Sequence, residues 1–189
     1  MSDEGAIVKL IETELAGVMV VEPEAIRDER GFFARTWDVL EFERRGLDTR
    51  IVQCSVSFNR VEGTLRGMHY QAAPYEETKL VRCEAGAIFD VAVDLRPSSP
   101  TFTRWVAFEL SAENRRALSI PAGCAHGFLT LADASQVSYH ISAPYTPDAA
   151  RGVRWDDPAF GIVWPAEVRV INERDASYPD FAFAGEAQQ

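Results

Sequence analysis

Hydrophobic and polar residues alternate most regularly between residues 51 and 59. Val52, Cys54, Val56 and Phe58 occupy every second position, and most residues between them are polar. Successive side chains of a β-strand point to opposite faces, so this period of two predicts a strand with an apolar back and a polar front. We expect the apolar back to pack on a core.

The same alternation recurs along most of the chain. Residues 79–95 predict two strands joined near residues 84–86. Further strands are predicted at residues 18–22, 64–71, 104–110, 117–120, 128–131 and 136–142. Helical patterns are few: residues 38–45 predict a short helix that ends near Gly46, and a turn or two is expected after Pro165. Short strands separated by Pro, Gly, Asn and Ser clusters predict an all-β sandwich or barrel.

One predicted strand breaks the rule of alternation in an informative way. Arg66 and His69 are three positions apart, so an ideal strand places them on opposite faces. Gly67 lies between them, and a bulge at this glycine would bring both side chains to one face. We therefore predict irregular backbone at Gly67 and a site where Arg66 holds an anion and His69 moves a proton.

Composition bounds the class of protein. The 189 residues are 47% hydrophobic and 25% charged, which is typical of a globular chain. We expect a single domain over residues 1–189, with its core at about residues 18–179, peripheral ends and a frayed tail at residues 185–189.

Charge and hydropathy exclude several partners. The net charge of −10 argues against nucleic acid, and no apolar run approaches the roughly 20 residues that span a membrane. The acidic first residues lack the basic region of a signal peptide, so we expect a cytoplasmic protein.

Cysteines and histidines do not predict a metal or disulfide framework. The three cysteines are far apart and are expected to be small buried hydrophobes: Cys54, Cys83 and Cys124. The three histidines are scattered as well: His69, His126 and His140. We expect no metal ligands among them.

The remaining chemistry centres on His69. As an acid or base it needs an orienting carboxylate, because a catalytic imidazole must be held in one tautomer. The candidates are Asp90, Asp94, Asp156, Asp157 and Asp175. Lys79 is either an edge charge or a group that polarises a carbonyl, and Tyr139 either fills the barrel or donates a proton. Tyr145 precedes Thr-Pro and is expected to be exposed, where its ring can stack on a base or sugar.

Taken in order, the motifs resemble one family. They include Leu-Arg-Gly-Met-His at 65–69 and Lys-Leu-Val-Arg-Cys at 79–83. Others are at residues 28–33, 89–94, 98–102, 110–114, 120–128, 155–157 and 161–165. From about residue 18 to 179 the chain resembles the dTDP-4-dehydrorhamnose 3,5-epimerases, which have a cupin-type jelly roll. The resemblance implies a cofactor-independent epimerase that inverts C3 and C5 of dTDP-4-keto-6-deoxy-D-glucose through an enolate, in dTDP-L-rhamnose or related deoxysugar synthesis.

The resemblance also implies catalytic roles. By it, His69 is the base and Asp175 orients His69, Tyr139 is the proton donor, and Lys79 lies near the developing oxyanion. The implied substrate-binding residues are Arg30, Gln53, Arg66, His126, Tyr145 and Arg174.

Among these, the resemblance assigns Arg66, His126 and Arg174 to the sugar and phosphates. By the same resemblance, Gln53 and Tyr145 are expected to contact the nucleotide, with Tyr145 stacked on the thymine. In the family's swapped homodimer, Arg30 reaches the ligand of the neighbouring subunit.

Departures from the family pattern lie on the nucleotide side. They are Ala34 and Arg35 in place of an aromatic and a glutamate, Ser55 in place of an asparagine, and the loss of an acidic residue expected a few positions after Tyr145, in the region of Ala149 and Ala150. The identity of the nucleotide base is therefore less determined than the chemistry. Three alternatives stay open: a C3-only epimerase, a 3,4-ketoisomerase and a non-catalytic sugar-binding cupin.

Overall fold

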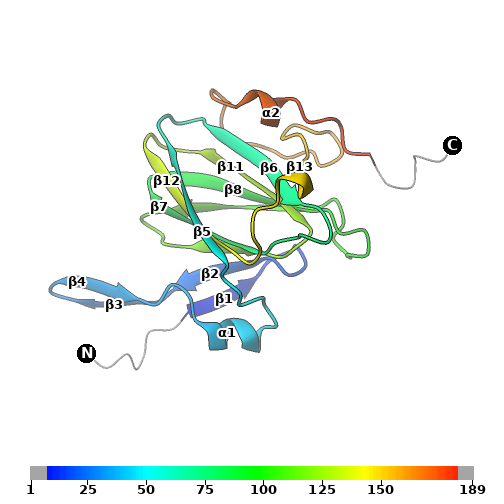
Figure 1. The fold of residues 1–189 in the computed structure, drawn as a ribbon. Helices are drawn as coiled ribbons and strands as arrows, with labels where there is room; N and C mark the ends of the chain where they lie inside the picture. Colours follow the sequence, from blue (N-terminus) through cyan, green and yellow to red (C-terminus); the bar gives the residue numbers. More distant parts are fainter. Residues whose placement is uncertain (1–7, 183–189) are drawn as a thin grey trace.

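Two β-sheets face each other in the computed structural model, which describes residues 8–182 (Figure 1). The first sheet has the order β1 (Val8–Glu12), β2 (Met19–Pro23), β10 (Ala117–Ile120), β7 (Lys79–Ala85), β12 (Ser135–Ile141) and β5 (Gln53–Asn59). The second has the order β13 (Ala150–Gly152), β6 (Leu65–Gln71), β11 (Cys124–Thr130), β8 (Ala87–Asp94) and β9 (Trp105–Ser111). All described neighbours within these sheets are antiparallel. The predicted all-β jelly roll of the cupin type is confirmed.

The first helix is also confirmed. Helix α1 (Val39–Arg44) begins where Asp38 accepts hydrogen bonds from the backbone N–H groups of Leu40 and Glu41. The predicted turns after Pro165 are wrong, because the second helix, α2 (Glu173–Ala176), begins later, at the N-cap Asn172. A single 3₁₀ turn, η1 (Pro147–Ala149), precedes β13.

Every strand predicted from alternation is present, although β11 starts four residues earlier than expected. The unpredicted strands are β1, β13 and the two strands of a hairpin, β3 (Ala25–Asp28) and β4 (Gly31–Ala34). They have three to five residues each, which is too few to establish a period. The hairpin projects from the body of the molecule at the left of Figure 1. The expectation for residues 185–189 lies outside the described residues.

Three apolar clusters hold the layers together. The central one lies between the two sheets and includes Val81 and Leu118 from one sheet and Ile88 and Phe128 from the other, each at most 1% exposed. A second cluster packs Phe42 of α1 on the outer face of the first sheet. A third covers the outer face of the second sheet with the segment that follows β13. Both sheets are therefore covered over much of their outer faces.

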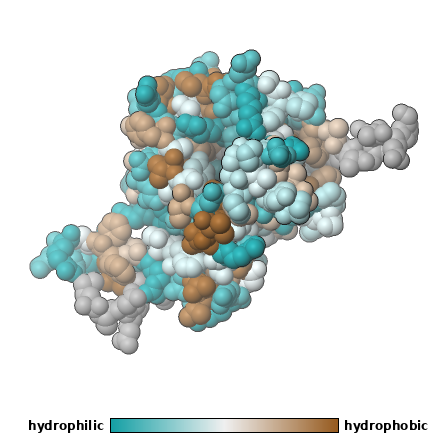
Figure 2. Space-filling model, viewed as in Figure 1, coloured by the Kyte–Doolittle hydropathy of each residue, from teal (hydrophilic) through white to brown (hydrophobic). Residues whose placement is uncertain are grey.

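Strand β5 departs from its prediction. Its polar residues face inward, whereas Val56 and Phe58 are 63% and 54% exposed, as is Val52 just before the strand, at 52%. The apolar back is therefore not packed on a core of this chain, because β5 is an edge strand and neither helix covers it. Figure 2 shows hydrophobic side chains on the surface where β5 lies in Figure 1. The burial expected for Cys54 is wrong for the same reason, while Cys83 and Cys124 are buried as predicted.

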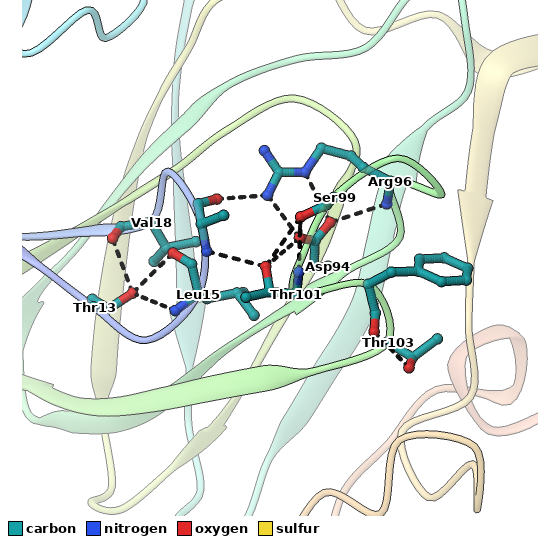
Figure 3. A network of polar contacts seen from close by, with 10 residues as sticks. Thr13, Leu15, Val18, Asp94, Arg96, Ser99, Thr101 and Thr103 are labelled. Atoms are coloured by element: carbon teal, nitrogen blue, oxygen red, sulfur yellow. Dashed lines mark hydrogen bonds and ion pairs between the residues drawn. The ribbon is translucent and has the colours of Figure 1, made fainter.

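A polar network fixes the end of β8 (Figure 3). Asp94 is fully buried and accepts hydrogen bonds from Arg96, Ser99 and Thr101. Burial alone would raise the pKa of Asp94, but these hydrogen bonds outweigh it and lower the pKa to about 2. Arg96 also donates a hydrogen bond to the backbone oxygen of Ala16, and the hydroxyl oxygen of Thr101 accepts one from the backbone N–H of Ala16. Asp94 thus ties the β1–β2 loop to the barrel and does not contact His69.

Among residues 8–182, no helix is long and apolar enough to cross a membrane. In the same part of the chain, no three His, Cys, Asp or Glu side chains are grouped as metal ligands would be.

Candidate active site

A cleft of about 330 Å³ opens between the two sheets. Its wall is built from β5, β6, β7, β11 and β12, and its mouth from the segments around β13 and α2. Of the ten residues expected at the site, eight line it: Gln53, Arg66, His69, Lys79, His126, Tyr139, Tyr145 and Arg174. The other two, Asp175 and Arg30, do not belong to the lining. The cleft is locally basic on an acidic chain, since Glu77 is the only carboxylate among the described residues that line it.

Irregular backbone at Gly67 brings Arg66 and His69 to the same cleft, as predicted. Gly67 has a φ of 129°, and the pairing of β6 with β11 shifts register between His126 and Phe128. In that interval β6 has one residue more than β11, which is the definition of a bulge. The bulge reverses the alternation, so both side chains line the cleft.

His69 is paired with Asp175. Its Nε2 lies 2.7 Å from Asp175 Oδ1, and Asp175 Oδ2 accepts a hydrogen bond from the backbone N–H of Gly67 at 3.0 Å. Burial alone would raise the pKa of Asp175, but these contacts outweigh it and lower the pKa. The ionised carboxylate favours a proton on Nε2 of His69, which leaves Nδ1 with a free lone pair. The His69 side chain is 41% exposed and is therefore accessible from the cleft that it lines.

The other candidate carboxylates for His69 have different partners. Asp90 is fully buried, and its Oδ1 lies 2.7 Å from Nε2 of His126. Burial raises the pKa of Asp90, although the contact with His126 acts in the opposite direction and lowers it in part. Asp156 pairs with Arg154. Asp157 accepts a hydrogen bond from the backbone N–H of Ala159, and Asp94 accepts one from the Thr101 hydroxyl. The cleft therefore has a second histidine–aspartate pair, which the sequence did not reveal because Asp90 and His126 lie on adjacent strands, β8 and β11.

Tyr139 reaches the cleft from β12. Its hydroxyl lies 3.4 Å from Ser57 Oγ, and its ring meets that of His126 edge-on at 6.1 Å. Burial raises the pKa of Tyr139 well above that of a free phenol. The phenol is therefore protonated at neutral pH and can donate a proton or a hydrogen bond.

Lys79 lies at the base of the cleft and is nearly buried. Its Nζ donates to the backbone oxygen of His69 at 3.0 Å and lies 2.9 Å from Oε1 of Glu77. Glu77 was missed from the sequence. A glutamate two positions before a strand lysine predicts no particular contact, since residues two apart share a face only in a regular strand.

The mouth of the cleft carries the residues expected to contact a nucleotide. Gln53 accepts a hydrogen bond from the backbone N–H of Tyr145 at 2.7 Å, and Tyr145 is 59% exposed as predicted. The guanidinium of Arg174 stacks over Tyr178. Arg151 also lines the mouth, although the sequence analysis did not select it.

Arg30 is not part of this chain's own cleft. It lies in the turn of the β3–β4 hairpin, where it pairs with Asp28. A contact between Arg30 and a ligand would therefore have to be made in another subunit.

The chain is thus a cupin-type jelly roll with a basic cleft that contains a paired histidine and a buried tyrosine. A family model for dTDP-4-dehydrorhamnose 3,5-epimerase matches residues 12–182. The dTDP-4-dehydrorhamnose 3,5-epimerase of Sinorhizobium fredii is 45% identical over 166 residues, which cover 87% of this chain and 85% of that protein.

Solved structures agree with the sequence comparison. The dTDP-4-dehydrorhamnose 3,5-epimerase of Bacillus anthracis, solved with TDP and PPi bound, is 39% identical with a TM-score of 0.89, covering 93% of this chain and 100% of that one. The 3'-monoepimerase ChmJ of Streptomyces bikiniensis, in complex with dTDP-quinovose, is 33% identical with a TM-score of 0.82, covering 89% and 85%. The chain belongs to the dTDP-4-dehydrorhamnose 3,5-epimerase family and is an epimerase, of the isomerase class.

Proposed function

We propose that the protein inverts C3 and C5 of dTDP-4-keto-6-deoxy-D-glucose, in the synthesis of dTDP-L-rhamnose or a related deoxysugar. The observation that carries this proposal is the sharing of one cleft by His69, oriented by Asp175, and the protonated phenol of Tyr139. The reaction needs a base and an acid at the carbons beside a ketone, and these two groups supply them.

In the proposed mechanism, His69 removes a proton from a carbon next to the C4 ketone. The electron pair of that C–H bond moves into an enolate, whose oxygen is stabilised by the Lys79 ammonium group. Tyr139 then returns a proton to the opposite face of the carbon, and the ketone is restored. His69 then releases its proton to solvent and Tyr139 takes one up, so that repetition at the second carbon completes the double inversion without a redox step.

We propose substrate contacts for the other residues that line the cleft. Arg66 and Arg174 are proposed to hold the sugar and diphosphate, because guanidinium groups match phosphate oxygens. His126, which lines the same cleft, is proposed to add a further contact to this part of the substrate. Gln53 and Tyr145 are proposed to contact the nucleotide at the mouth of the cleft.

Proton NMR in deuterium oxide tests the activity directly. With dTDP-4-keto-6-deoxy-D-glucose, we expect deuterium to enter at both C3 and C5, with inversion. Deuterium at C3 alone would instead establish the C3-only epimerase, an alternative favoured by the similarity to ChmJ. No exchange at either carbon would contradict the epimerisation of this substrate, and the nucleotide-side departures at Ala34, Arg35, Ser55 and Ala150 would then point to a different nucleotide.

We also propose that the protein is a homodimer in which Arg30 reaches the neighbouring cleft. The exposed apolar face of β5 supports this, as do Phe32 and Phe33 of the hairpin, which are 46% and 48% exposed. Burying such a patch against a second copy removes it from water.

Val56→Glu on β5 is expected to convert the dimer to a monomer, because it places a charge in the buried interface. Light scattering coupled to size-exclusion chromatography measures the mass. Val163→Glu is the matched control, since Val163 is 72% exposed on the segment that covers the other sheet, and it should leave the mass unchanged. A wild-type monomer, or a Val56→Glu dimer, would contradict the proposed interface.

A further inference from the structure

Glu77 is the one acidic residue in the wall of an otherwise basic cleft. It is 8% exposed, and its Oε1 lies 2.9 Å from Lys79 Nζ. Its Oε2 is buried and has no hydrogen-bond partner among the described residues. Burying a carboxylate costs free energy unless it is paired, so Lys79 is the partner on which this side chain depends.

The segment that carries Glu77 is fixed on both sides. Gln71 donates a hydrogen bond to the backbone oxygen of Tyr75 at 2.8 Å. Thr78 exchanges two hydrogen bonds with Ser142, one through the Ser142 hydroxyl at 2.8 Å and one through its backbone N–H at 3.1 Å. The carboxylate is therefore presented by a rigid loop, whereas Lys79 has a long, flexible side chain.

The hydrogen bonds of Lys79 then determine where its charge points. An ammonium group has three N–H donors. One is directed to Glu77 and one to the backbone oxygen of His69. A single donor is left for the cleft, so its direction is set by the other two.

We propose that Glu77 is a positioning residue that holds the Lys79 ammonium group so that its remaining N–H points at the substrate's ketone oxygen. The proposal rests on the proposed function for its catalytic consequence. The contacts run from Glu77 through Lys79 to the backbone of His69, and from the His69 ring to Asp175. Two buried carboxylates thus position two members of the proposed catalytic set: Glu77 holds Lys79, the proposed oxyanion donor, and Asp175 holds His69, the proposed base.

The lysine content of the chain allows this positioning to be observed without substrate. The sequence has only two lysines, Lys9 and Lys79. Lys9 is 56% exposed at its side chain and lies 3.8 Å from Glu24. In protein labelled with ¹⁵N-lysine, the buried and hydrogen-bonded Lys79 ammonium should give a ¹H–¹⁵N signal, because its protons are protected from exchange, while exposed Lys9 should not.

We expect this Lys79 signal to shift and broaden in Glu77→Gln and to vanish in Glu77→Ala, which removes the acceptor altogether. Glu24→Gln is the matched control, since it removes the carboxylate beside the other lysine, and it should leave the Lys79 signal unchanged. If Glu77→Ala does not fold, the isosteric Glu77→Gln still decides the question. An unchanged signal in Glu77→Gln would overturn the proposal.

Kinetics with the nucleotide sugar test the catalytic consequence. Glu77→Ala should lower kcat by about tenfold or more while KM changes by less than about threefold, because a misplaced donor weakens the transition state more than the bound ground state. Glu77→Gln keeps an acceptor and should lose less. Wild-type kcat in Glu77→Ala would overturn the positioning role. If the wild-type protein itself shows no turnover, the proposed function fails. The ¹H–¹⁵N signal still tests whether Glu77 positions Lys79, because that experiment needs no substrate.

Discussion

Replacing His69 with alanine is expected to slow the exchange of the sugar C–H protons with solvent by about a thousandfold, which is within the usual contribution of a general base. The affinity for the nucleotide should stay within about twofold, because His69 acts on the sugar and the proposed nucleotide contacts lie at the mouth of the cleft. Deuterium incorporation followed by NMR measures the first quantity, and calorimetric titration with dTDP measures the second.

His140→Ala is the matched control for this experiment. His140 lies on β12 beside Tyr139 but does not line the cleft, so the same substitution there should leave exchange nearly normal. Normal exchange in His69→Ala would contradict the assignment of the base. Equal losses of exchange and of dTDP affinity would assign His69 to binding instead.

Gly67→Ala is expected to destabilise the protein by about 3 kcal/mol or more, a cost typical of overpacking combined with strained backbone. A Cβ on Gly67 would lie 2.5 Å from Gly127 Cα and 2.9 Å from the backbone oxygen of His126. Both contacts are with backbone, so no side chain can move aside. Chemical denaturation measures the free energy of unfolding.

Gly31→Ala is the control that separates the steric clash of the new Cβ from the backbone strain of a non-glycine residue at positive φ. Gly31 has a φ of 130°, nearly the same as Gly67, yet a Cβ there would meet nothing within 4 Å. This control should therefore lose only the conformational part, about 1 to 2 kcal/mol. If the two variants were equally destabilised, the close approach of β6 and β11 would not be the reason for glycine at position 67.

The sequence predicted the layers of the fold because both sheets have strands long enough to show a period of two. It failed at β5 for a physical reason: alternation reports that a strand has two chemically different faces, not which of them meets the core of its own chain. Val56 is apolar and 63% exposed, while Ser57 beside it lines the cleft. A surface that a second copy would cover has the same pattern as a core.

The site was predictable only in part. The irregular backbone at Gly67 followed from the odd spacing of Arg66 and His69. The partner of His69 did not, because five aspartates were equivalent by residue type, and only the family resemblance selected Asp175. Glu77 gave no signal because its role depends on the direction of a loop.

Asp175 lies late in the sequence, and this position has a consequence for the synthesis of the protein. The last strand of the barrel, β13, ends at Gly152, whereas Asp175 lies in α2, after a long segment that packs on the second sheet. All strands among the described residues can therefore be synthesised while His69 still lacks its carboxylate and Gly67 N–H lacks an acceptor. The carboxylate proposed to orient His69 is therefore among the last parts of the site to be synthesised, because α2 follows every described strand in the sequence.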